Sequence, residues 1–256
     1  MPVPVRFKVA MAGLLCRPGV GALIARLFSD RIPVGGLRLD THSPEITPGT
    51  KAQLFWRLYE RAELRMVARY FPRDLDVVEL GASIGMISIH LARRLGAGRR
   101  MVSVEANPAL TRLVEANVRE HAPHARLEVV GAAIDYPSDG RREARFHVAT
   151  RNVDSRLSTA PGARTVPVPT ITLSGLLDRH GLERFALVSD IEGAEAAILF
   201  EDPAALGGCE WLLIELHQTM HRGRSVSVDD MVTRLGELGF ALVARRGPVV
   251  VAQRRK

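Results

Sequence analysis

The stretch that most constrains the fold joins an apolar run to a helical pattern through two glycines. The run 75–80 is broken only by acids, which predicts a buried parallel strand. After Gly81 and Gly85, apolar residues recur at helical spacing until Gly96 ends the helix. Because a strand, a glycine turn and a helix bring the backbone close to a ligand at the carboxyl end of a sheet, we expect a binding site there.

The acid and the glycine spacing of this turn narrow the choice of ligand. Glu79 lies near the end of the predicted strand, where a buried carboxylate is unfavourable unless something pairs with it. A ligand with hydrogen-bond donors or positive charge would supply that pairing. The spacing Gly81-x-x-x-Gly85 lacks the middle glycine of the G-x-G-x-x-G loop that binds a dinucleotide pyrophosphate. Small-residue turns of this kind also occur in many α/β proteins for packing reasons alone.

The next two predicted strands end in residues suited to a nucleoside. The strand 101–105 ends in Glu105, one β-α-β unit later, where an acid can accept from both hydroxyls of a ribose. The strand 127–134 ends in small residues, and Ala132 and Ala133 leave room for a flat ring. Close packing of strand on helix would explain the same alanines. These features favour adenosine binding without choosing a cofactor.

Two later strands bring acids and a histidine to the same edge of the predicted sheet. An apolar strand over 185–189 is followed by Asp190, Glu192 and Glu195, and a strand over 211–216 is followed by His217. A helix N-terminus favours acids and accounts for one or two of these carboxylates. A histidine at a strand end is often only a hydrogen-bonded structural residue, so its role as a base is one of two interpretations.

The rest of the chain completes an alternating α/β pattern. Residues 1–50 are predicted as a helical cap and linker, and residues 51–256 as the main domain. One amphipathic helix is expected over 51–71, in which Tyr59 and Glu60 either belong to a salt-bridged face or cover the pocket as a lid.

The alternation is interrupted once and ends in a hairpin. The insertion 136–170 is predicted to carry short strands at 144–149 and 165–168 around a polar loop, 151–159, which is either a substrate loop or a plain hairpin. The terminal strands 240–244 and 249–252 predict an antiparallel hairpin, which favours a methyltransferase sheet over an all-parallel dehydrogenase sheet.

Composition limits the partners and the compartment. The net charge of +7 comes mostly from scattered arginines, and aromatic content is only 5%, so a platform for single-stranded nucleic acid is not indicated and no specific nucleic-acid partner is expected. Cys16 and Cys209 are far apart, which suggests reduced thiols in a cytoplasmic protein. No apolar run is long enough to span a membrane. The N-terminal apolar run predicts an amphipathic helix with at most weak membrane contact.

Taken together, these segments resemble the FkbM family of S-adenosylmethionine-dependent methyltransferases over about residues 52–220. The combination of the glycine loop with a downstream D-x-E-G-x-E is the specific part. The segments that carry the resemblance are Tyr59-Glu60, 78–85 (VELGASIG), 104–108 (VEANP), 168–173 (VPTITL), 190–195 (DIEGAE) and 214–217 (IELH).

The resemblance implies a doubly wound, mostly parallel seven-stranded α/β sheet of the Rossmann-like class I methyltransferase type, with a C-terminal antiparallel hairpin and an N-terminal helical cap. It implies O-methylation of a hydroxyl on a sugar, glycan or polyketide-type small molecule, with S-adenosylmethionine as cofactor. The cofactor residues expected from it and from the patterns above are Glu79, Gly81, Ala82, Ser83, Gly85, Glu105, Ala106, Asn107, Ala132, Ala133 and Asp190. The expected substrate residues are Asn152, Ser155, Arg156 and Glu195.

The sequence leaves two points of chemistry open. One is which group removes the acceptor's proton, and the other is what balances the charge of the acidic cluster of Asp190, Glu192 and Glu195. A hydroxyl is a poor nucleophile, so a base is expected, with Asp190, Glu192 and His217 as catalytic candidates. Mg²⁺ held by Asp190 and Glu192 is a second mechanism. The family often has lysine at the position of Val188, and a metal or another cation would replace its charge.

Three other functions compete with O-methylation. They are a non-catalytic adenosine-binding or scaffold protein with the same fold, a nucleotide-dependent dehydrogenase, and an RNA methyltransferase. Against an RNA methyltransferase, the chain lacks the N/D-P-P-Y signature for methylation of amino groups on bases. The sequence sets neither the acceptor nor the oligomeric state.

Overall fold

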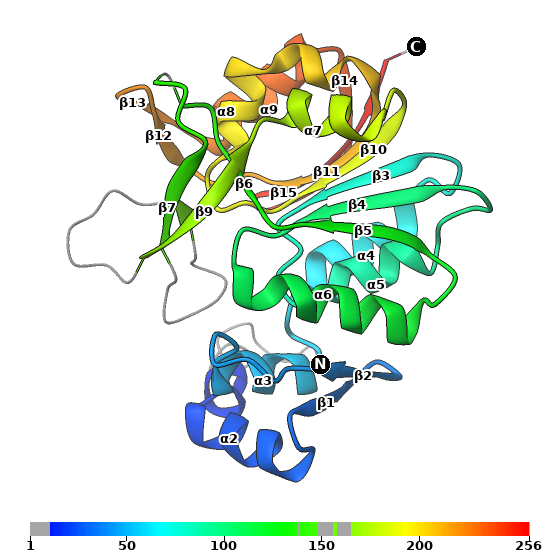
Figure 1. Ribbon diagram of the computed structural model, residues 1–256, viewed down its shortest axis with the longest axis vertical. Coiled ribbons are helices and arrows are strands. Elements are labelled where there is room, and N and C mark those ends of the chain that lie inside the picture. The colour runs from blue at the N-terminus through cyan, green and yellow to red at the C-terminus, as the bar shows by residue number, and fades with distance from the viewer. Residues whose placement is uncertain (1–10, 138, 148–155, 158–164, 256) are drawn as a thin grey trace, which may run out of the picture.

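The computed structural model describes residues 11–137, 139–147, 156–157 and 165–255 (Figure 1). Its centre is one seven-stranded sheet in the order β14-β15-β11-β10-β3-β4-β5. The strands are β3 (Asp76–Leu80), β4 (Arg100–Val104), β5 (Arg126–Val130), β10 (Phe185–Ser189), β11 (Cys209–Glu215), β14 (Phe240–Arg246) and β15 (Val249–Arg254). The first five are mutually parallel, and β15 runs antiparallel to both β11 and β14. The predicted fold class, with its terminal hairpin, is confirmed.

Helices cover both faces of this sheet, as Figure 1 shows. One layer holds α4 (Arg61–Tyr70), α5 (Met86–Ala92) and α6 (Pro108–His121), and the other holds α7 (Leu173–His180), α8 (Glu195–Glu201) and α9 (Val228–Glu237). Neighbouring strand residues point to opposite faces, so Val77 belongs to the first apolar cluster and Val78 to the second. The central strands β3, β10 and β11 are buried on both faces, so most of their residues are apolar.

The order in which the chain adds strands to the sheet reverses between β3 and β10, although the two strands are parallel. From β3 the chain continues through β4 and β5 on one side, and it later returns to β10 and β11 on the other. The register pairs Leu80 with Ser189, so Gly81 and Asp190 leave the sheet side by side. In doubly wound sheets, ligands bind in the crevice at such a switch point, beyond the carboxyl ends of the strands.

The N-terminal segment is more structured than the sequence indicated. It contains α2 (Pro18–Leu27), a hairpin of β1 (Arg31–Val34) and β2 (Leu37–Asp40), and α3 (Pro48–Phe55). The predicted linker therefore contains a β-hairpin, whose turn residues Gly35 and Gly36 have φ of +58° and +87°. The hairpin packs into the apolar cluster of the α4–α6 layer. The domain boundary at residue 50 stays a prediction.

The prediction of one helix over 51–71 is wrong. The chain forms α3 and α4 with a break at 56–60, where Arg57 and Glu60 adopt left-handed backbone conformations, with φ of 57° and 45°. The apolar periodicity runs through the break because Leu58, which lies within it, is itself partly buried. The break matters for function, since it places Tyr59 and Glu60 at the carboxyl edge of the sheet.

The prediction of one strand over 127–134 is also wrong. β5 ends at Val130, and β6 (Ala133–Ile134) pairs with β9 (Thr165–Ile171) in a separate sheet of order β6-β9-β7-β8. This sheet also includes β7 (Glu143–His147) and β8 (Arg156–Leu157), so the inserted region carries strands near the predicted positions. A further hairpin, β12 (Thr219–His221) with β13 (Arg224–Val226), follows β11, and a short 3₁₀ helix, η2, spans Pro203–Gly208. Within the described ranges, no helix is long and apolar enough to cross a membrane.

Candidate active site

A cavity of about 680 Å³ opens at the carboxyl ends of β3, β4 and β10. Its volume is in the range of pockets for small molecules and cofactors. Nine of the predicted site residues line it: Gly81, Ser83, Glu105, Ala106, Ala132, Ala133, Asp190, Glu192 and His217. These residues come from chain segments more than a hundred positions apart, and the sheet brings them together.

Gly81 forms the floor where β3 and β10 meet. Its φ is +84°, and a Cβ there would lie 1.9 Å from the carbonyl oxygen of Asp190. The amide of Asp190 in turn donates to the carbonyl of Leu80 at 2.9 Å, which fixes the two chains against each other. Only glycine fits this approach, and its missing side chain leaves the backbone open toward the cavity.

Glu105 is held by the backbone of two neighbouring loops. Its Oε2 accepts from the amide of Ser83 at 2.6 Å, and its Oε1 accepts from the amide of Asn107 at 2.7 Å. Burial raises the pKa of Glu105 to about 7, against the opposing effect of these hydrogen bonds. Asn107 itself caps α6 by accepting from the amide of Ala109, and it does not line the cavity. The ribose contact of Glu105 stays a prediction.

Glu79 lies beneath the cavity and does not line it. Its side chain is 1% exposed, and Oε2 accepts from the hydroxyls of Ser88 at 2.7 Å and Ser103 at 2.6 Å. Two serines from α5 and β4 thus bond to Oε2, whereas Oε1 is buried without a hydrogen-bond partner among the described residues. The expected contact with a ligand is corrected because Glu79 does not line the cavity. Burial raises the pKa of Glu79 to about 7.

Ala82 and Gly85 support the loop from behind. Neither lines the cavity, and Ala82 is buried. Gly85 precedes α5 with φ of +82°, and a Cβ there would lie 3.3 Å from the Cα of Val114. The second glycine of the motif therefore allows α5 and α6 to pack closely, which is a structural role.

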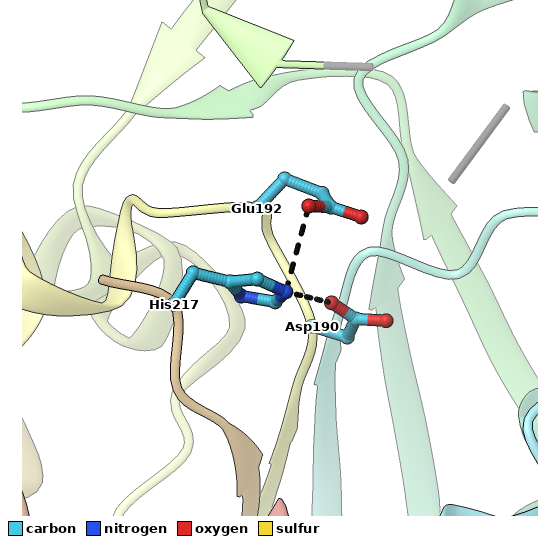
Figure 2. Close-up of side chains that lie close together, drawn as sticks. All are labelled: Asp190, Glu192 and His217. Carbon is cyan, nitrogen blue, oxygen red and sulfur yellow. Dashed lines mark ion pairs between the residues drawn. The ribbon is translucent and has the colours of Figure 1, made fainter. Parts of the chain in front are cut away.

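His217 stands at the centre of the acidic cluster. Figure 2 shows its ring pointing toward Asp190 and Glu192, with Nε2 lying 3.9 Å and 3.5 Å from their carboxylate oxygens. On the other side of the ring, Nδ1 lies 3.3 Å from Oε1 of Glu195. Glu215 is a fourth carboxylate, 3.9 Å from Nε2. One imidazole thus faces carboxylates from two strand ends and a helix N-terminus.

The electrostatics of the cluster follow from this crowding. Burial alone would lower the pKa of His217, but its hydrogen bond to Glu195 and the charges of the surrounding carboxylates raise that pKa to about 9. Burial and the charges of Glu215 and Glu192 raise the pKa of Asp190 well above its ordinary value. Burial is also the main cause that raises the pKa of Glu215 to about 7. The cluster therefore favours positive charge, whether from protons or from a ligand.

Glu195 was predicted to contact substrate, and the structure contradicts this. Its side chain is 0% exposed. Oε1 accepts from the amide of Ile191 and Oε2 from the amide of Gly193, each at 2.9 Å. The carboxylate folds the 190–195 turn and orients His217, and both tasks require it to be buried.

The metal ligands predicted for Mg²⁺ lie close together. Asp190, Glu192 and His217 each offer a donor atom, and these atoms lie within 4.8 Å of one another. His217 would be a third ligand that the sequence did not indicate. Carboxylate oxygens suit Mg²⁺ and an imidazole nitrogen suits transition metals. Metal binding itself stays a prediction.

The predicted substrate loop is only partly described. Asn152 and Ser155 lie outside the described residues, and of Arg156 the structure describes the backbone, which pairs with His147. Their substrate contacts stay predictions.

Sequence reasoning missed several parts of the cavity wall. Asp135 and Phe146 come from the small sheet, and Thr219 and Met220 come from β12. The glycine at 223, in a turn with positive φ, is a signal from which the β12–β13 hairpin could have been found.

The residues present fit a nucleoside with a cationic group. Ala106, Ala132 and Ala133 give small apolar walls, Glu105 offers carboxylate oxygens, and Gly81 leaves a cradle that a Cβ would fill. Near the acidic cluster, Oδ1 of Asp190 is buried without a hydrogen-bond partner among the described residues. A sulfonium nucleoside matches both ends of this cavity in charge and shape.

Comparison with solved structures gives likenesses at low identity. A putative tRNA (m1A22) methyltransferase, Sp1610 of Streptococcus pneumoniae in complex with S-adenosyl-L-methionine, is 14% identical, with a TM-score of 0.43 over 76% of this chain and 74% of that chain. Magnesium protoporphyrin IX methyltransferase (ChlM) from Synechocystis PCC 6803 with bound SAM is 13% identical, with a TM-score of 0.39 over 76% of each chain.

Comparison with protein sequences is more informative. A curated relative, the AMB antimetabolite synthetase AmbE of Pseudomonas aeruginosa, is 25% identical in a 208-residue alignment that covers 64% of this chain and 10% of that protein. The chain thus spans about a tenth of its relative's length. The model of the Methyltransferase FkbM domain matches residues 79–242, from Glu79 in β3 to Leu242 in β14. The chain therefore belongs to the FkbM family of S-adenosylmethionine-dependent methyltransferases.

Proposed function

We propose that the protein transfers the methyl group of S-adenosylmethionine to a hydroxyl oxygen of a sugar, glycan or polyketide-type small molecule, with His217 as the base. The observation that carries this proposal is the setting of His217. Its Nδ1 lies 3.3 Å from the buried Glu195, which leaves Nε2 directed toward Asp190 and Glu192 at the cavity (Figure 2). A base oriented by a buried carboxylate is a recurrent way to activate a hydroxyl nucleophile.

The reaction follows from this arrangement. The donor supplies an electrophilic methyl carbon. The acceptor oxygen forms a bond to that carbon as the carbon–sulfur bond breaks. The electron pair of the carbon–sulfur bond stays on sulfur. With Nδ1–H donating to Glu195, the neutral imidazole accepts the acceptor's proton at Nε2. Asp190 and Glu192 then stabilise the imidazolium, since both carboxylates lie within 4 Å of Nε2.

The charge of the donor suits the same cluster. With a pKa of about 9, His217 holds its proton at neutral pH before a cation arrives. A sulfonium in the cavity would compensate the carboxylates and favour the neutral imidazole that the reaction needs. Donor binding and activation of the base are thereby coupled.

Two observations favour a small acceptor. The cavity volume of about 680 Å³ has room for a cofactor and little more than a small molecule beside it. The curated relative is named as an antimetabolite synthetase, which favours small-molecule chemistry over nucleic acid. The unpaired state of Cys16 and Cys209 supports the proposed cytoplasmic location, and weak membrane contact of the N-terminus stays a prediction.

The test is methyl transfer from labelled S-adenosylmethionine to a panel of sugars, glycans and hydroxylated small molecules, followed by kcat/KM against pH. We expect kcat/KM to rise with pH up to about 9, where free His217 loses its proton. His217→Gln should lower kcat by ~10²-fold or more. The matched control is His221→Gln, another cavity histidine beside a carboxylate, Glu201 at 3.4 Å.

A flat pH profile, or equal activity of His217→Gln and wild type, would contradict the base. Our alternative proposal for the same reaction is Mg²⁺ held by Asp190 and Glu192, which would activate the acceptor oxygen. If a chelator abolished activity and Mg²⁺ restored it, the metal mechanism would be favoured over the base mechanism. Donor binding without transfer to any acceptor would favour the scaffold interpretation.

A further inference from the structure

We propose that Glu60 binds the α-ammonium group of the methyl donor's amino-acid tail and so distinguishes this donor and its product from nucleosides that lack the tail. This inference rests on the proposed function, because it assumes the donor in the cavity. It assigns a role to a carboxylate that the transfer step does not use.

The backbone presents Glu60 to the cavity through an uncommon conformation. Glu60 lies in the break between α3 and α4 with φ of 45° and ψ of 35°, a region that residues other than glycine rarely adopt. Tyr59 beside it is 4% exposed, and its hydroxyl is hydrogen-bonded to Oγ of Ser83 at 2.8 Å. This hydrogen bond therefore holds the break against the loop 81–85, which we call the cofactor loop, and Glu60 lies in the wall of the cavity.

The side chain of Glu60 lacks a protein cation. The residue is half-buried and a hydrogen bond from Tyr59 lowers its pKa, but its Oε2 is buried with no hydrogen-bond partner among the described residues. Asp190 and Glu63 are close enough to add repulsion. The chain has 35 lysines and arginines, but none of them is among the described residues that line the cavity. Five carboxylates do line it: Glu60, Glu105, Asp135, Asp190 and Glu192. A buried carboxylate in such surroundings calls for a cationic ligand.

The position of Glu60 selects the ammonium among the donor's groups. Ser83 connects the two ends of the site, because its amide donates to Glu105 and its hydroxyl bonds to Tyr59. If the ribose binds Glu105, the amino-acid tail of the donor can extend past Ser83 toward Glu60. The tail carries an ammonium with three N–H donors, whereas the sulfonium has none, so of the two cationic groups only the ammonium can hydrogen-bond to a carboxylate.

Proton linkage gives an independent signature. Burial, followed by the charge of Asp190, raises the pKa of Glu60 well above its ordinary value. Without a ligand these causes favour the protonated form of Glu60, and pairing with an ammonium favours the ionised form. Titration in buffers of different ionisation enthalpy should show proton release for a ligand with the ammonium, and less of it in Glu60→Gln.

The direct test is calorimetric binding of S-adenosylhomocysteine and 5′-methylthioadenosine, which share the nucleoside but differ in the amino-acid tail. We expect Glu60→Gln to weaken S-adenosylhomocysteine by ~10-fold or more and 5′-methylthioadenosine by less than ~2-fold. Glu63→Gln is the matched control. It neutralises a buried carboxylate of α4, the helix that follows Glu60, and this carboxylate does not line the cavity, so both ligands should bind the variant nearly as well as wild type.

A third ligand tests the ammonium by a change in the ligand in place of a change in the protein. Deamino-S-adenosylhomocysteine keeps the tail's carboxylate but lacks the ammonium, so it should bind wild type and Glu60→Gln equally. Equal weakening of all three ligands by Glu60→Gln, or no weakening of any, would overturn the role of Glu60 while leaving the proposed function intact. A folded wild type that binds none of these nucleosides would overturn the proposed function, and the ammonium site with it.

Discussion

At the scale of single residues, the site holds carboxylates that oppose folding. Burial and the charge of Asp190 raise the pKa of Glu60 well above its ordinary value. Because the folded-state pKa exceeds the unfolded value of ~4.3, the folded protein binds more protons, and the contribution of Glu60 to stability is full below that pH and lost as pH rises toward the folded pKa. Without ligand, this residue favours function at the expense of stability.

We therefore expect Glu60→Gln to stabilise the ligand-free protein. The free energy of unfolding in urea should rise by about 1–2 kcal/mol near pH ~8, and the gain should shrink toward pH ~4. Glu237→Gln, which removes an exposed carboxylate paired with Arg234 at 2.9 Å, should change it by less than ~0.5 kcal/mol at either pH. A Glu60→Gln protein that is less stable than wild type at the higher pH would show that the carboxylate has a favourable partner in the free protein.

Residue-level prediction worked for the cavity wall and failed for the carboxylates behind it. Gly81, Ser83, Glu105 and His217 were identified because a strand end followed by a polar or small residue is visible in the sequence. Glu79 and Glu195 follow the same rule but pair with protein groups. The partners of Glu79 lie nine and 24 residues away on other elements, so only the packed structure shows that its charge is already hydrogen-bonded.

At the scale of elements, the closest approach in the site is between the ends of β3 and β10. Gly81 and Gly98 make a matched pair for testing it. Both have strongly positive φ, +84° and +79°, but a Cβ on Gly81 would meet the Asp190 carbonyl at 1.9 Å, whereas a Cβ on Gly98 would meet nothing within 4 Å. The two positions separate backbone strain from steric collision.

Gly81→Ala should lower the free energy of unfolding by at least ~3 kcal/mol, and Gly98→Ala by about 1 kcal/mol. The difference arises because the collision is with backbone, which cannot move without separating the two strands. Chemical denaturation of both variants measures it. Similar losses in the two proteins would mean that the strands separate easily, and the account of Gly81 as the floor of the cavity would fail.

The sheet was predictable from the sequence because its strands are short apolar runs between turns, and those of β3, β4, β10 and β11 appear at their predicted positions. The breaks within two predicted elements could not be predicted from the sequence. The apolar pattern passes through residues 56–60 because Leu58 is partly buried at a break, and Gly131 interrupts two strands that were predicted as one. Apolar periodicity indicates which residues are buried. It does not show where the backbone changes its hydrogen-bonding partners, because residues can stay buried across such a change.

At the scale of the whole molecule, Asn117 joins the N-terminal segment to the cofactor loop. Its amide nitrogen donates to the carbonyls of Asp40 at 3.0 Å and Ile84 at 2.9 Å, and its oxygen accepts from the amide of Asp40 at 2.8 Å. The side chain is fully buried on α6. One amide group thus satisfies the end of β2 and the turn that follows Ser83. The N-terminal segment is in this way a structural support of the site.

Asn117→Ala should leave these three backbone groups unpaired. We expect the free energy of unfolding to fall by about 2–3 kcal/mol and S-adenosylhomocysteine to bind more weakly, because Ser83 and the glycine turn lose their anchor. His121→Ala is the control, since it removes an exposed bond from α6 to the same hairpin, at the carbonyl of Arg38. It should cost less than ~1 kcal/mol and leave ligand affinity unchanged. If Asn117→Ala lowered stability without changing affinity, the N-terminal segment would support the fold alone and not the position of the cofactor loop.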